Sequence, residues 1–152
     1  MRSLRSVALL VAVTLVLVAC GRISTDAPAP TPADFQGIAT EISKRDIVID
    51  DLVSGDAGCT GSALTPTAIG LTAYGLDQST PVRLHLYIFR NRASFEKLRA
   101  SIDDCARSFV TDPETYETIE ESPFVVVSQG PWAPRFEAAL REALQVSAGT
   151  GD

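Results

Sequence analysis

The apolar stretch Val7–Ala19 most constrains this chain, because it decides which residues can belong to a folded domain. Its thirteen residues include one polar side chain, Thr14, and the six residues before it hold two arginines and no acidic residue. Such a stretch is too short to span the hydrocarbon core of a bilayer, which needs about 20 helical residues. Its length and its basic flank are typical of a secretory signal peptide. We therefore expect Met1–Ala19 to be a signal peptide, and a buried N-terminal helix is the alternative.

The residues that end this stretch, Leu17-Val18-Ala19-Cys20, resemble the lipobox of bacterial lipoprotein signal peptides. The resemblance covers residues 1–21. It implies that the chain is cut before Cys20 and that the Cys20 thiol carries a diacylglycerol. Two or more acyl chains anchor a protein stably, since each buried methylene contributes about 0.8 kcal/mol. The resemblance thus predicts an exported protein, anchored by lipid to the bacterial cell membrane, with its domain outside the cytoplasm.

The residues after the lipobox divide into a spacer, a domain and a tail. Three prolines alternate with other residues between positions 28 and 32, which favours an extended chain. We expect residues 20–33 to be the lipidated cysteine and a proline-rich linker. We expect residues 34–146 to form a single domain and residues 147–152 to be a flexible tail.

The charge balance excludes two classes of partner. Without Met1–Ala19, which holds two arginines and no acidic residue, the formal net charge changes from −6 to −8. Nucleic-acid binding and docking on anionic lipid both depend on clustered basic residues. We therefore expect no nucleic-acid partner, and we expect membrane contact only through the lipid on Cys20.

Two cysteines remain once Cys20 is assigned to the lipid, namely Cys59 and Cys105. In an exported domain a single remaining pair predicts a disulfide. The bridge would close a loop of about 46 residues and stabilise the domain by roughly 4 kcal/mol in the chain-entropy model. The alternative is a pair of free thiols, one of them catalytic, with His85 as the base.

Hydrophobic periodicity and turn residues predict the elements of the domain. The predicted helices are residues 32–45, a helix from the N-cap Asn91 to about Phe109, an acidic helical turn over 112–120, and residues 134–146. The predicted strands are residues 47–53, 68–74, 82–89 and 124–128. A helix over 68–74 is an alternative, because two glycines weaken that strand.

The order α-β-β-β-α-(α)-β-α predicts an α+β fold. A turn-rich loop separates strands 68–74 and 82–89, which are expected to form a hairpin. The helix between strands 82–89 and 124–128 favours a right-handed crossover that makes these two strands parallel. We expect a two-layer sandwich in which helices cover a four-stranded mixed sheet.

The strand over 82–89 contains the first candidate site. The period of two places Arg83, His85 and Tyr87 on the face opposite the aliphatic side chains. If this face is uncovered, it is an aromatic and cationic platform for a ligand or a partner. The alternative is that a helix covers it and that His85 forms a hydrogen bond at the edge of the layer.

Trp132 is the second candidate, in the loop between strand 124–128 and the last helix. Loops at this place in α/β-type sheets often present ligands, and tryptophan is favoured at binding hot spots. The alternative is that Trp132 packs against Phe136 and fixes the direction of the chain.

We find no motif for catalysis or metal binding. A single histidine without His-x-x-x-His or Cys-x-x-Cys argues against zinc, and no EF-hand spacing occurs. The sequence lacks the Gly-x-Ser-x-Gly of serine hydrolases and a phosphate-binding glycine-rich loop. The clustered Glu117, Glu120 and Glu121 could serve glycoside hydrolysis, although such a charge run usually faces solvent. We therefore expect no metal and no cofactor.

These features predict a non-catalytic binding or accessory module of the cell envelope, which takes an envelope protein or a small ligand. The alternatives are an envelope hydrolase that uses His85 with a carboxylate, and a purely structural domain. An open sheet face would favour the binding module. A carboxylate with a shifted pKa beside His85 in a cleft would favour the hydrolase.

Overall fold

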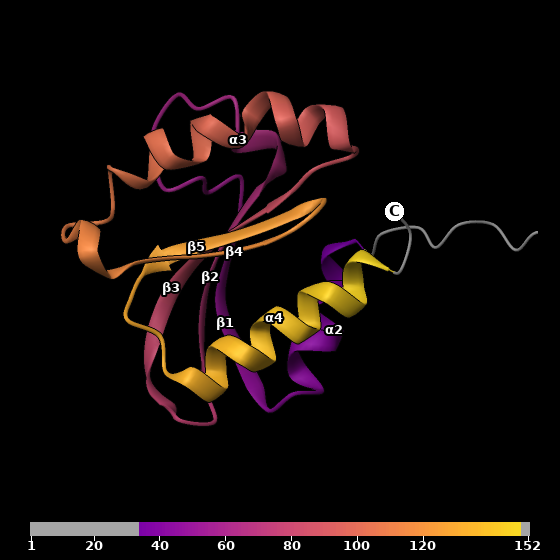
Figure 1. Cartoon of the computed structure of the whole chain (residues 1–152), viewed down its shortest axis with the longest axis vertical. Coiled ribbons are helices and arrows are strands. Elements are labelled where there is room, and N and C mark those ends of the chain that lie inside the picture. The colour runs from indigo at the N-terminus through magenta and orange to yellow at the C-terminus, as the bar shows by residue number, and fades with distance from the viewer. Residues whose placement is uncertain (1–33, 150–152) are drawn as a thin grey trace, which may run out of the picture.

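Five antiparallel strands form the centre of the fold, which the computed structural model describes for residues 34–149 (Figure 1). The strands are β1 (Ile47–Ser54), β2 (Ala68–Gly75), β3 (Gln78–Ile88), β4 (Tyr116–Glu121) and β5 (Phe124–Gln129). Their order in the sheet is β1-β2-β3-β5-β4, so that β1 and β4 are its edges. The predicted signal peptide, Cys20, the linker up to residue 33 and the tail from residue 150 lie outside the described residues.

Three helices complete the domain: α2 (Phe35–Ser43), α3 (Arg92–Ala106) and α4 (Pro134–Ala148). Asn91 caps α3 as predicted, since its side chain accepts a hydrogen bond of 2.9 Å from the backbone N–H of Ser94. In α2 the observed cap is Asp34, and the helix begins at Phe35, three residues later than the predicted start at residue 32. The helix α4 continues to Ala148, so that the first residues of the predicted tail belong to it. Within residues 34–149, no helix is long and apolar enough to cross a bilayer.

The helices cover both faces of the sheet. Both α2 and α4 pack on one face, where the core includes Ile38, Leu84, Leu86 and Leu140. On the opposite face, α3 and the loop between β1 and β2 lie over one half of the sheet (Figure 1). The predicted two-layer sandwich is therefore wrong in this half, which has three layers. The reason is that β3 and β5 carry large buried side chains on both faces, so both need a cover.

The predicted four-stranded mixed sheet is also wrong, because residues 112–120 are not a helical turn. A short 3₁₀ turn, η2 (Pro113–Thr115), leads directly into β4, which pairs with β5 in an antiparallel hairpin. The extra strand reverses the chain once more before β5, and β5 consequently pairs antiparallel with β3. Acidic residues are tolerated in β4 because it is an edge strand.

The predicted hairpin of β2 and β3 is confirmed, and the alternative of a helix over 68–74 is wrong. The two strands pair from Ala68 opposite Tyr87 to Gly75 opposite Gln78. Leu71 and Leu84 lie opposite each other in the ladder and belong to the core between the sheet and the helices α2 and α4. A second 3₁₀ turn, η1 (Thr65–Thr67), directs the loop after β1 into β2.

Candidate functional site

On the face of β3 that carries Arg83, His85 and Tyr87, the side chains change from exposed to buried along the strand. Arg83 exposes 38% of its side chain, whereas His85 is 4% and Tyr87 0% exposed. The β5 residues Val125 and Val127, which lie opposite Tyr87 and His85, are also fully buried. The cover predicted as the alternative is therefore present at one end of the strand and ends at Arg83.

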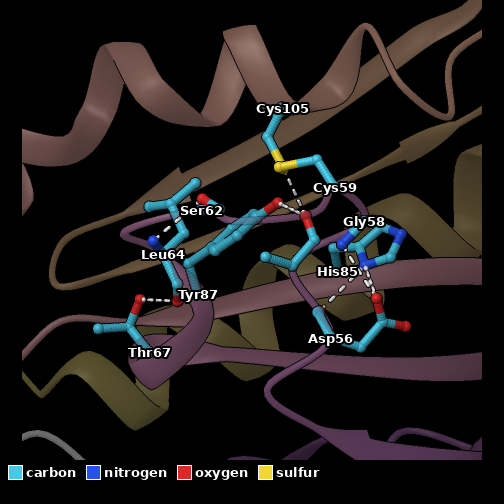
Figure 2. Close-up of a disulfide and its surroundings, with 10 residues drawn as sticks. Asp56, Gly58, Cys59, Ser62, Leu64, Thr67, His85, Tyr87 and Cys105 are labelled. Carbon is cyan, nitrogen blue, oxygen red and sulfur yellow. Dashed lines mark hydrogen bonds and ion pairs between the residues drawn. A yellow bond between two sulfur atoms is a disulfide. The ribbon is translucent and has the colours of Figure 1, made fainter.

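The disulfide between Cys59 and Cys105 fixes the cover in place (Figure 2). It joins the loop after β1 to α3, with the two Cα atoms 5.4 Å apart. The predicted bridge is thus confirmed. The strand β3 also holds this loop, because the Tyr87 hydroxyl donates a hydrogen bond of 2.9 Å to the carbonyl oxygen of Ala57. Tyr87 therefore attaches the loop to the sheet, and its side chain has no exposed area that a ligand could contact.

His85 lies beneath this loop at the boundary of the cover. Its Nδ1 is 3.3 Å from the backbone carbonyl oxygen of Asp56 and 3.7 Å from the Asp56 carboxylate (Figure 2). Phe109 packs on the ring with centroids 4.4 Å apart, and Gly58 lies against Nε2. Burial lowers the pKa of His85, as does the Arg83 charge, and the contacts with Asp56 oppose this only in part. The lowered pKa favours the neutral ring, and a hydrogen bond from Nδ1 to the Asp56 carbonyl oxygen requires the proton on Nδ1, because a carbonyl oxygen only accepts.

Asp56 and Arg83 form an ion pair next to His85. The Asp56 carboxylate is 2.5 Å from Arg83 Nη2 and accepts a hydrogen bond of 2.9 Å from the backbone N–H of Gly58. Burial raises the pKa of Asp56, but Arg83 and the Gly58 N–H outweigh it, so the net shift is downward. Arg83 also donates through Nη1 to the carbonyl oxygen of Asp51. The pair connects the loop to the sheet at the point where the cover ends.

At this pair and next to it, β1, β2 and β3 project side chains that are exposed or half-buried. We call this surface the open face, and its members are Val48, Asp50, Val53, Thr72, Tyr74 and Arg83. The register places them on one side of the sheet, since Val48 lies opposite Tyr74, and Thr72 lies between Asp50 and Arg83. Val48 and Val53 are 44% and 48% exposed. The Asp50 carboxylate, through its charge and a hydrogen bond, raises the pKa of the Tyr74 phenol.

Trp132 is in the core, where its indole N–H donates a hydrogen bond of 2.9 Å to the Ser128 hydroxyl. Its ring meets Phe136 edge-on with centroids 6.4 Å apart. The structure therefore gives Trp132 the packing role, as it does Tyr87. Of the four residues predicted to bind a ligand, Arg83 alone has an exposed side chain.

Sequence reasoning missed Asp56 and Tyr74. Asp56 follows the predicted strand 47–53, and no local pattern shows that it folds back over the sheet. Tyr74 had a usable signal. In a hairpin of strands 68–74 and 82–89, alternation places one set of β2 side chains on the same face as Arg83.

The remaining candidates for chemistry do not converge. In β4, Glu117 and Glu121 project to the face opposite Glu120, because alternate residues of a strand point to opposite sides. Glu120 is paired with Arg99, and Glu121 accepts a hydrogen bond from Gln145. Residues 34–149 contain no group of three or more histidine, cysteine, aspartate or glutamate side chains that could hold a metal ion. Comparisons of the chain with protein-family models, curated proteins and solved structures find no match.

Proposed function

We propose that this chain is an exported, lipid-anchored module of the bacterial cell envelope that binds a partner through the open face. The observation that carries the proposal is the incomplete cover of one sheet face. One half of that face is buried under α3 and the disulfide-linked loop, while the other half keeps Val48, Tyr74 and Arg83 accessible. The lipobox-like residues before Cys20 support the location, and the disulfide is consistent with it.

The composition of the open face supports binding. Tyrosine and arginine are enriched at the centres of protein interfaces, where apolar area is surrounded by a polar rim. Here Val48 supplies apolar area opposite Tyr74, Val53 supplies apolar area opposite Gly70, and Asp50 and Arg83 supply opposite charges. The strands beneath are held by a buried core on the other side of the sheet. A surface that is rigid before binding loses little conformational entropy when the partner arrives.

The contact between Asp56 and His85 favours a second candidate function, hydrolysis with His85 as the base. Phe109 and Gly58 cover the imidazole ring, so a substrate would reach it only if Phe109 moved. This candidate predicts that Phe109→Ala raises hydrolysis of a substrate and that His85→Gln abolishes it. Binding at the open face predicts that neither substitution alters capture of the partner.

Photo-crosslinking in intact envelopes tests the proposed binding. The probe replaces Tyr74, and a matched probe replaces Ala138 on α4, which is exposed but lies on the other side of the sheet. We expect one stoichiometric adduct from Tyr74, none from Ala138, and loss of the adduct with Val48→Glu. Equal adducts from both positions, or none from Tyr74, would contradict the proposal.

The anchor is tested separately through Cys20. Cells that express the full chain are labelled with a fatty acid that carries a clickable group. We expect label and membrane association with the natural sequence and loss of both with Cys20→Ser. Retention of the label on the Cys20→Ser protein would show that the lipid is attached elsewhere.

A further inference from the structure

The outer edge of β1 combines an open ladder with exposed apolar side chains. β1 pairs with β2 on one side only, so its other side has backbone groups without a strand partner within residues 34–149. Of the four large apolar side chains that are strongly exposed in this part of the chain, three are on β1: Val48, Leu52 and Val53. An exposed apolar edge of this kind is a template for another strand.

A hollow of about 610 Å³ follows this edge. Its walls include Ala39 and Ser43 of α2 and residues Ile47, Val48 and Ile49 of β1. Ile47 and Ile49 point toward α2, whereas Val48 belongs to the open face, on the opposite side of the strand. Because both sides of β1 line the hollow, it lies at the edge of the strand itself.

The usable length of the edge is short. The pairing of β1 with β2 is regular from Ile47 to Asp50 and then shifts, and Asp51 has a φ of 50°. A bulge of this kind ends a regular ladder. Four residues span about 13 Å, which is enough for a short added strand. The edge therefore fits a brief extended segment rather than a continued sheet.

The negative charges at this edge indicate which kind of strand could bind there. Asp46, Asp50 and Asp51 are exposed and have no ion pair within residues 34–149. A second copy of β1 would bring another set of these carboxylates to the same short ladder, and like charges across a strand pair are unfavourable. A strand with lysine or arginine side chains would instead form ion pairs there.

We propose that the β1 edge receives an extended segment of the partner in which apolar and basic residues alternate. This proposal rests on the proposed binding function and specifies its mode. Backbone hydrogen bonds extend the sheet by one strand, apolar side chains fill the hollow beside Ile47 and Ile49, and basic side chains pair with Asp50 and Asp51. The partner then continues from the edge onto the adjoining open face.

The test uses the mature lipidated protein in detergent and an eight-residue peptide of alternating valine and lysine. One control peptide has glutamate in place of lysine, and another keeps the side chains but carries N-methyl groups on alternate backbone amides. We expect the valine–lysine peptide to bind at least tenfold more tightly than either control and to slow amide exchange in β1. Equal binding by the N-methylated peptide would overturn strand addition.

Two variants test the charges. Asn replaces both aspartates in the double variant Asp50→Asn/Asp51→Asn, and asparagine tolerates the positive φ of position 51. We expect it to bind the peptide about tenfold more weakly, while Glu114→Gln, an exposed change on η2, has no effect. Unchanged binding by the double variant would overturn the selection of basic residues. Dimers of the protein alone, seen by light scattering, would assign the edge to a second copy.

The two proposals fail in different ways. A Tyr74 adduct that persists while no peptide binds at β1 would leave binding at the open face intact and overturn strand addition. Peptide binding without any Tyr74 adduct would support the edge and contradict the open face. Absence of both would overturn both.

Discussion

The Asp56 carboxylate and the Arg83 guanidinium form an ion pair of 2.5 Å that joins the loop after β1 to the third strand. The pair lies directly over Gly70 in β2, which is opposite His85 in the ladder. A Cβ at position 70 would overlap both charged groups. The absence of a side chain at Gly70 is therefore a condition for this pair.

Gly70→Ala is expected to destabilise the protein by about 1–3 kcal/mol, because the added methyl forces the ion pair or the loop to move. Urea unfolding measures this. The control is a double-mutant cycle with Asp56→Ala, which removes one of the two groups that the methyl meets. We expect the cost of Gly70→Ala to be smaller in that background, and strictly additive effects would contradict the assignment.

The buried His85 makes stability depend on pH. Burial is the largest cause of its lowered pKa, so the folded protein holds this proton less tightly than the unfolded chain, whose value is about 6.5. Unfolding then takes up a proton between the two pKa values, and the free energy of unfolding decreases as the pH falls below about 6.5. We expect His85→Gln to remove this part of the pH dependence.

The measurement is direct because the chain has one histidine. The imidazole signals in an NMR titration of the folded protein should give a pKa below 6.5. A value at or above 6.5 would mean that the Asp56 contacts outweigh burial and that the sign is reversed.

Local patterns predicted the parts of the fold that depend on local physics. Alternation in β3 separated Arg83, His85 and Tyr87 from the aliphatic side chains, and the cysteine count predicted the bridge between Cys59 and Cys105. The stretch around Glu117 and Glu121 was misassigned because acidic residues with one central isoleucine fit a solvated helical turn as well as an edge strand. Pairing with β5 decides between them, and that pairing is not visible in the segment itself.

Distant contacts determine further features that no local pattern shows. The helix α4 has no side-chain cap from its own N-cap residue, and Asp77 in the β2–β3 turn instead accepts hydrogen bonds from the backbone N–H groups of Arg135 and Phe136. The coverage of His85 and Tyr87 likewise depends on a loop folding back across the sheet. Alternation showed that His85 and Tyr87 share the face of Arg83, but the extent of the cover is a tertiary property.

The disulfide is expected to stabilise the native state by about 4 kcal/mol, since it closes a loop with a sequence separation of 46 residues. Urea unfolding with and without reductant measures this contribution. The double variant Cys59→Ala/Cys105→Ala is the matched control and should not respond to reductant. In both reduced and variant proteins, amide exchange of the loop around Ala57 should increase. Equal stability of the natural protein in both conditions would contradict this role.

Ser128 is expected to contribute through its bond to Trp132. Ser128→Ala leaves the buried indole N–H without an acceptor, at a cost of about 1–3 kcal/mol. Ser147→Ala is the matched control, because Ser147 is also buried but donates only to the carbonyl oxygen of Ala143 in its own helix. Removing that hydroxyl leaves no buried donor unpaired. Unfolding followed by the fluorescence of the single tryptophan should therefore show a larger loss for Ser128→Ala, and equal losses would contradict the role of the bond.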